Sequence, residues 1–262
     1  MITGKRIKYV GQSVVAFIFM YLFLLPLSAP LSFKILLMLG FVAVASVITH
    51  FPNVKFNNIV FGVILPFQLF LGTLLFLTFY PNLSSAFKIV VVVGFSVIYY
   101  LVSLMDNIFF VVQDREEQIP LYRVAVTGIQ ILTVIVAIPL FSALFKFNLN
   151  VLVQSFLVFI FSVLFGIYQF WGLHFDKDLK VVRVGELAVL NLFVGFLATA
   201  ANMSVSFFPT EPFIRALYVS SVLSFGLGYV HGHLKNDINK KGLLMFIAII
   251  LIFFFVLLTF KQ

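Results

Sequence analysis

The chain has 262 residues, of which 63% are hydrophobic and only 10% are charged, and its mean hydropathy is +1.17. A soluble domain is about half apolar and about one-quarter charged, so this chain has too few polar side chains to cover a soluble core. The composition therefore excludes a soluble domain and predicts an all-α protein, a polytopic bundle of transmembrane helices. The net charge of +8 indicates basic loops at a membrane surface and not nucleic-acid binding.

Hydrophobic runs predict nine membrane spans, because a spanning helix needs about 20 mainly apolar residues. The segments that satisfy this requirement are 10–28, 33–50, 58–80, 87–112, 121–145, 149–172, 184–207, 213–231 and 242–260. Proline or asparagine stands at several of the breaks, where proline favours a turn or a helix start over helix continuation. No loop is long enough to be a domain, so we expect residues 1–262 to form a single integral membrane domain.

The distribution of Lys and Arg predicts the orientation. With a cytoplasmic N-terminus and nine alternating spans, 12 of the 17 basic residues fall on the cytoplasmic side. The cytoplasmic set is Lys5, Arg6, Lys8, Lys55, Arg115, Arg123, Lys177, Lys180, Arg183, Lys235, Lys240 and Lys241, and the outer set is Lys34, Lys88, Lys146, Arg215 and Lys261. Since cytoplasmic loops carry an excess of basic residues, we expect the N-terminus in the cytoplasm and the C-terminus outside.

The densest charge cluster is the stretch 113–123, which reads QDREEQIPLYR. Four consecutive charges, Asp114 to Glu117, are too costly in hydrocarbon, so the chain must surface here. We expect a short cytoplasmic hairpin between the fourth and fifth spans, with Pro120 near the first turn of the fifth span. Contact with water explains these charges better than catalysis does.

Asp106 and Asn107 lie inside the fourth predicted span, about two turns from its cytoplasmic end. An intramembrane carboxylate is costly and indicates a function by default. Arg123 enters the fifth span across the hairpin, at a depth where it could meet Asp106. One interpretation is a polar pocket or proton site, and the other is a structural ion pair or an arginine that reaches toward the interface.

The seventh predicted span carries three further polar candidates. Glu186 stands in its first turn, three residues after Arg183, a spacing that allows an ion pair and places a carboxylate at a helix N-terminus. Asn191 and Asn202 lie farther along the span. Their amides could bridge helices by hydrogen bonds or line a solute path, and both interpretations stay open.

The eighth predicted span carries a face of small residues spaced by four positions: Ser220, Ser224, Gly228 and Gly232. Such a face predicts close helix–helix packing, either within the chain or between protomers. At the end of this span, His231 and His233 stand near Asp237. Solvated interfacial histidines are expected there, and we predict no catalytic residue, no metal site and no cofactor.

The segment that runs from Asn107 into the fifth span reads NIFFVVQDREEQIPLYRVAVTGIQIL. It resembles uncharacterised polytopic inner-membrane proteins of small-genome bacteria. This resemblance implies a multi-pass protein of a bacterial cytoplasmic (inner) membrane and no particular activity.

Three functions stay open from the sequence. The protein could be transporter-like, for a small solute or lipid, or a non-enzymatic component that acts in the lipid bilayer with a membrane-protein partner or as a homo-oligomer. The alternative is a membrane-embedded enzyme that acts on a lipid-linked substrate at the cytoplasmic face. Such an enzyme would use Glu116, Glu117, His231 and His233, and its loops would have to converge.

Overall fold

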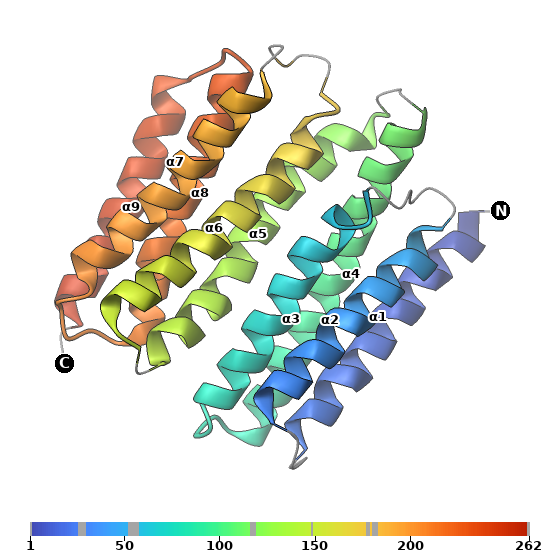
Figure 1. The fold of residues 1–262 in the computed structure, drawn as a ribbon, viewed down its shortest axis with the longest axis horizontal. Coiled ribbons are helices and arrows are strands. Elements are labelled where there is room, and N and C mark those ends of the chain that lie inside the picture. The colour runs from blue at the N-terminus through green and yellow to red at the C-terminus, as the bar shows by residue number, and fades with distance from the viewer. Residues whose placement is uncertain are drawn as a thin grey trace. The chain divides into compact units, whose positions relative to one another are not determined.

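The computed structural model describes residues 2–25, 30–51, 58–115, 119–147, 149–176, 179 and 183–260, with side chains from residue 7 onward. Nine α-helices account for most of this described part of the chain (Figure 1). They are α1 (Ile2–Leu24), α2 (Leu31–His50), α3 (Phe61–Phe79), α4 (Ser85–Arg115), α5 (Leu121–Lys146), α6 (Val151–Leu173), α7 (Val184–Val205), α8 (Pro212–Leu234) and α9 (Lys240–Thr259). All nine are long and apolar enough to cross a membrane, which confirms the predicted all-α, multi-pass class.

Several helices extend past the predicted segments, and α1 and α4 are two of them. α1 begins at Ile2, ahead of the apolar run, because Lys and Arg are good helix formers and the helix continues into water. α4 continues to Arg115, so the first charges of the stretch 113–123 belong to its last turn. Residues 116–118 of that stretch lie outside the described residues.

The helix ends follow local chemistry. Pro212 is the first residue of α8, where the N–H that proline lacks would have no helical partner. Asn150 and Asn239 cap α6 and α9, and each side-chain oxygen accepts the backbone N–H two residues on, at 3.2 and 3.0 Å. Pro66 and Pro139 lie inside α3 and α5, and both helices continue through them, as membrane helices tolerate.

Contacts divide the chain into two compact units, Met1–Leu132 (unit 1) and Thr133–Gln262 (unit 2). Unit 1 holds α1–α4 with the first half of α5, and unit 2 holds the second half of α5 with α6–α9. The two units are described separately below. That residues 1–262 form a single membrane domain remains a prediction.

In unit 1, α1 packs mainly on α4, and α3 packs on α2 and α4. The ring of Phe70 on α3 is the centre of an aromatic core, at 5.6 Å from the ring of Phe41, 4.5 Å from Phe95 and 5.4 Å from Tyr99. These edge-on contacts join α2, α3 and α4. α1 and α2 touch each other much less, although they are consecutive and run side by side in Figure 1.

In unit 2, each helix from α6 to α9 packs on the next. Glycines make two of these contacts close. A Cβ added at Gly195 of α7 would lie 2.7 Å from Val163 and 3.0 Å from Phe159 of α6. A Cβ added at Gly228 would lie 2.7 Å from the ring of Phe246 on α9. The small-residue face of α8 therefore contacts α9 within the chain at Gly228.

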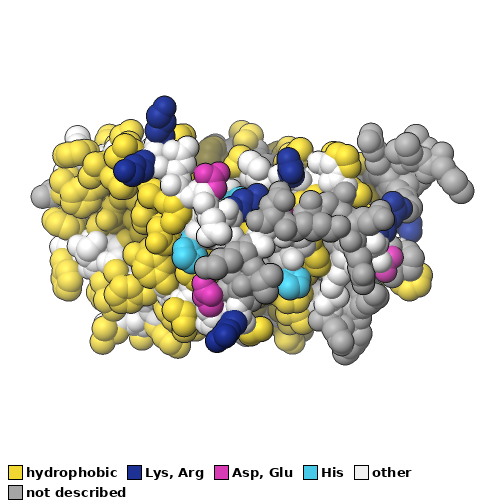
Figure 2. All heavy atoms as spheres, turned by 90° about the horizontal axis from the view of Figure 1, so that it is seen from above, with side chains coloured by type: hydrophobic (Ala, Val, Ile, Leu, Met, Phe, Trp, Pro, Cys, Tyr) yellow, Lys and Arg dark blue, Asp and Glu magenta, His cyan; other side chains and the backbone are white. Residues whose placement is uncertain are grey.

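Large apolar side chains are exposed along the helices, for example Leu152 of α6 at 67% and Phe255 of α9 at 62%. Lipid is the medium that covers such surfaces at no cost. Charged side chains and histidines appear among apolar ones at the helix ends that Figure 2 views. The side of the membrane to which each end belongs remains a prediction.

We expect Gly195→Leu to destabilise the α6–α7 contact by about 1–3 kcal/mol, the usual cost of overpacking. Gly185→Leu in the same helix is the matched control, because an added Cβ there meets nothing within 4 Å. Thermal unfolding of the purified full chain in detergent, followed by circular dichroism, measures both. Equal unfolding midpoints for the two variants would contradict the close packing at Gly195.

Candidate functional site

The first of two polar clusters lies in unit 2 and joins the ends of four helices. Arg215, in the first turn of α8, donates from Nη2 to Oε1 of Gln154 at 2.8 Å, to Oδ1 of Asn202 at 2.7 Å and to Oγ of Ser206 at 2.6 Å. Its Nε donates to the same Asn202 oxygen at 3.2 Å. The ring of Phe145, from α5, lies 4.4 Å from the guanidinium carbon. We call these five residues the Arg215 cluster.

The acceptors of the Arg215 cluster are themselves held in place. Asn202 is fully buried, and its Nδ2 donates to Oγ of Ser155 on α6 at 2.9 Å. Gln154 is 4% exposed, and its Nε2 donates to the carbonyl oxygen of Leu144 at 3.0 Å. Both amides thus turn their oxygens toward the arginine, and the network fixes the plane of the guanidinium.

The Arg215 cluster carries a positive charge without an anion. All acceptors of Arg215 are uncharged, and no carboxylate among the described residues contacts it. Its Nη1 makes no hydrogen bond within the described part of the chain, and this atom is not buried. A guanidinium edge of this kind binds carboxylate or phosphate oxygens with two parallel hydrogen bonds. The cluster can therefore hold an anion at Nη1.

The second polar cluster lies in unit 1, around His50 at the end of α2. His50 is 2% exposed, and its Nδ1 lies 2.9 Å from the carbonyl oxygen of Ser46. Its Nε2 lies 3.1 Å from the carbonyl oxygen of Ser103 on α4. A carbonyl oxygen only accepts, so both contacts are hydrogen bonds only when both ring nitrogens carry hydrogen. In the neutral imidazole, one ring nitrogen donates to its carbonyl oxygen and the other only lies close to its own.

Asp106 lies on the face of α4 that holds His50. It is fully buried and follows Ser103 by three residues. Phe110, four residues farther, has its ring 5.1 Å from the His50 ring. Positions three and four apart share one face of a helix, so the carboxylate lies on the His50 side of α4. We call His50, Ser103 and Asp106 the His50 cluster. A carboxylate and an imidazole within spans are the groups from which membrane proteins build proton sites.

The other candidates in the fourth and fifth predicted spans are less buried than Asp106. Asn107 is half-buried on α4, and Arg123 is exposed in the first turn of α5. The ion pair between Asp106 and Arg123 stays a prediction. The structure thus gives Asp106 a surrounding that sequence reasoning did not expect, with the imidazole of His50 on the same face.

The two amides predicted on α7 have different environments. Asn202 belongs to the Arg215 cluster. Asn191 is eleven residues earlier, about 16 Å along the helix axis. Its side chain lies against the backbone of Gly166 on α6, and its Oδ1 is buried with no hydrogen-bond partner among the described residues. Asn191 therefore contributes packing, and Asn202 contributes a hydrogen-bonded acceptor.

The residues of the enzyme hypothesis are only partly described. His233 Nε2 lies 3.6 Å from Oε1 of Glu186, so this carboxylate faces α8 and not the Arg183 side chain that its spacing suggested. Glu116 and Glu117 lie outside the described residues. No group of three or more His, Asp or Glu side chains suited to a metal occurs within the described part of the chain.

Sequence reasoning missed Arg215 and His50 as site residues. Arg215 was counted only as an outer-side charge, and His50 only as the end of the second span. A signal was present in both cases, because each residue falls inside the bounds of an apolar segment. Their partners come from other helices, which pairing along one helix does not reveal.

We expect Asn202→Leu to destabilise the protein by about 1–3 kcal/mol, because it leaves Arg215 and Ser155 without their buried partner. Asn191→Leu is the matched control in the same helix, since the Asn191 oxygen has no partner to lose. We expect this control to be neutral or stabilising, and urea or thermal unfolding in detergent measures both. A loss at Asn191 equal to that at Asn202 would show that the Arg215 network contributes nothing.

Comparison with known proteins adds no family to this description. No family model, no curated protein and no solved structure matches the chain. The geometry alone therefore identifies the protein, as a multi-pass, all-helical membrane protein whose described units each contain a polar cluster within apolar helices.

Proposed function

We propose that the protein is a transporter-like membrane protein that binds an anionic group, a phosphate or carboxylate, at the Arg215 cluster. The group belongs either to a small solute or to the headgroup of a lipid. The observation that carries this proposal is the half-buried guanidinium of Arg215, which is held only by uncharged acceptors and keeps Nη1 accessible.

The acceptors distinguish this arginine from one that only reaches toward water. A snorkelling arginine obtains its acceptors from water and headgroups at the interface. Here Gln154 and Asn202, at 4% and 0% exposed, supply them from the protein and orient the guanidinium before any ligand arrives. Orientation of this kind reduces the entropy cost of binding. The uncompensated charge then favours an anion over a neutral ligand.

The His50 cluster supports transport over simple binding. Buried carboxylates and histidines within spans serve as proton relays in pumps and transporters. Asp106, fully buried on the face of α4 that holds His50, is the group that we assign to proton coupling. The resemblance of the segment that begins at Asn107 supports a bacterial cytoplasmic membrane as the location.

The experiment measures thermal unfolding of the full chain with added ligand. A rise of the midpoint with inorganic phosphate in detergent indicates a solute, and a rise with phosphatidylglycerol in nanodiscs indicates a lipid headgroup, because a ligand of the folded state raises its stability. We expect Arg215→Gln to weaken binding roughly ten- to a hundredfold, the value of a charge-assisted hydrogen bond. Arg215→Lys keeps the charge but not the planar edge, and we expect an intermediate loss.

Arg183→Gln is the matched control, since Arg183 is exposed at the start of α7 and belongs to neither cluster. It should bind as the wild type does. No midpoint rise with either ligand, or an unchanged rise in Arg215→Gln, would refute the proposed site.

The proposed coupling of transport to protons is tested separately, by uptake of the bound anion into proteoliposomes. In Asp106→Asn this uptake should lose its dependence on a proton gradient while binding of the anion is kept.

A further inference from the structure

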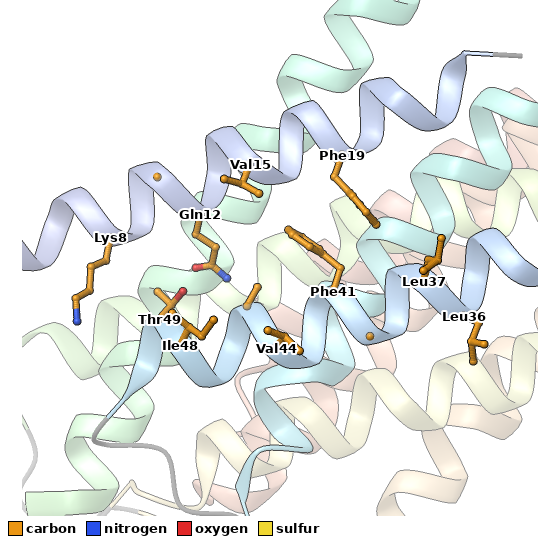
Figure 3. Close-up of a pocket in the computed structure, with 13 residues that line it drawn as sticks. Lys8, Gln12, Val15, Phe19, Leu36, Leu37, Phe41, Val44, Ile48 and Thr49 are labelled. Atoms are coloured by element: carbon orange, nitrogen blue, oxygen red, sulfur yellow. The ribbon is translucent and has the colours of Figure 1, made fainter. Parts of the chain in front are cut away.

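A groove of about 690 Å³ runs between α1 and α2 of unit 1 (Figure 3). Residues 8–19 of α1 and 36–49 of α2 line it. The wall formed by α2 is about 20 Å long at about 1.5 Å per residue, which exceeds half of a hydrocarbon core of about 30 Å. Its volume falls in the range of roughly 300–1,000 Å³ that small-molecule sites occupy. The groove therefore has the size of a ligand site and the depth of one membrane leaflet.

Two glycines and two aromatic rings shape this groove. Gly11 of α1 and Gly40 of α2 both line it, and a Cβ added at either residue meets nothing within 4 Å. The rings of Phe19 and Phe41 stack at 4.5 Å and bridge the two helices away from the Lys8 end, as Figure 3 shows. The space is thus open along the glycines and bounded by the rings.

Polar groups are confined to one end of the groove. Lys8 is exposed at this end, and Gln12 follows one turn along α1 (Figure 3). Gln12 is 8% exposed, and its Nε2 donates to the Tyr99 hydroxyl at 2.6 Å. Its Oε1 is buried and has no hydrogen-bond partner among the described residues. Beyond Gln12 the side chains are almost all apolar. A buried acceptor without a partner indicates that a donor enters from the groove.

We infer that the groove binds an anionic lysophospholipid, that is, a phosphate-bearing glycerolipid with one acyl chain. Its phosphate lies at the ammonium group of Lys8. Its glycerol hydroxyl donates to Oε1 of Gln12, and its chain follows the apolar wall toward Phe19. A two-chain phospholipid has an ester in place of that hydroxyl and no donor at this depth.

Selectivity comes from the polar end of the groove. The lipid tails of the bilayer are as apolar as the groove, so burial of a chain there gives no net preference. The charge of Lys8 favours an anionic headgroup, and the unpartnered oxygen of Gln12 favours a hydroxyl. This site lies in unit 1 and does not depend on the anion site that we propose at Arg215.

Native mass spectrometry of the full chain tests this inference with three probes of equal chain length: lysophosphatidylglycerol, lysophosphatidylcholine and phosphatidylglycerol. We expect the wild type to retain the first about tenfold better than the third, the effect of one satisfied buried acceptor. Lys8→Gln should abolish the preference for the lysophosphatidylglycerol over the lysophosphatidylcholine. Equal retention of the one-chain and two-chain anionic lipids by the wild type would overturn the inference.

Gly40→Leu fills the groove, and we expect it to lower retention of lysophosphatidylglycerol about tenfold while thermal stability is kept. Gly94→Leu on α4 is the matched control, because an added Cβ there also meets nothing within 4 Å and Gly94 does not line the groove. Retention by Gly40→Leu equal to that of Gly94→Leu would overturn the site. Arg215→Gln should retain the lipid as the wild type does, which separates this result from the test of the Arg215 cluster.

Discussion

A membrane interior provides no hydrogen-bond partners, and the structure of this protein depends on that constraint. Backbone N–H and C=O groups in lipid must be satisfied within the same segment, so each apolar run of sufficient length becomes a helix. Side chains obey the same rule. The oxygens of Gln154 and Asn202 face Arg215, and their amide nitrogens donate to oxygens on neighbouring helices. Polar side chains in these spans therefore gather in clusters that join several helices.

Packing in a membrane relies on close approach, because lipid tails provide no hydrophobic drive for helix association. Glycine therefore has two opposite roles here. Gly195 and Gly228 are contact points where a side chain of a neighbouring helix lies 2.7 Å from the position that a Cβ would take. Gly11 and Gly40 do the reverse, since nothing lies within 4 Å of an added Cβ and a groove remains. The same residue type thus closes unit 2 and leaves unit 1 open between α1 and α2.

The two polar clusters have complementary chemistry. The Arg215 cluster presents a fixed cation to an anionic ligand, and the His50 cluster presents a buried carboxylate and an imidazole suited to protons. Each lies in its own compact unit. The transport that we propose, of an anionic group with proton coupling, would use both clusters.

The sequence by itself determined the class, the number of spans and most helix bounds, because hydrophobic length and proline placement act locally. It also singled out Asp106 and Asn202, since any ionisable or amide group inside an apolar run stands out. Only the tertiary structure decided their surroundings. His50 reaches Ser103 from another helix, and Arg215 collects acceptors from α6 and α7, contacts that join residues 53 and 61 positions apart in the sequence. Helical periodicity fixes which residues share one helix face, but it carries no information about which faces meet. The groove between α1 and α2 is a product of tertiary packing for the same reason, because the sequence shows two glycines and not the space beside them.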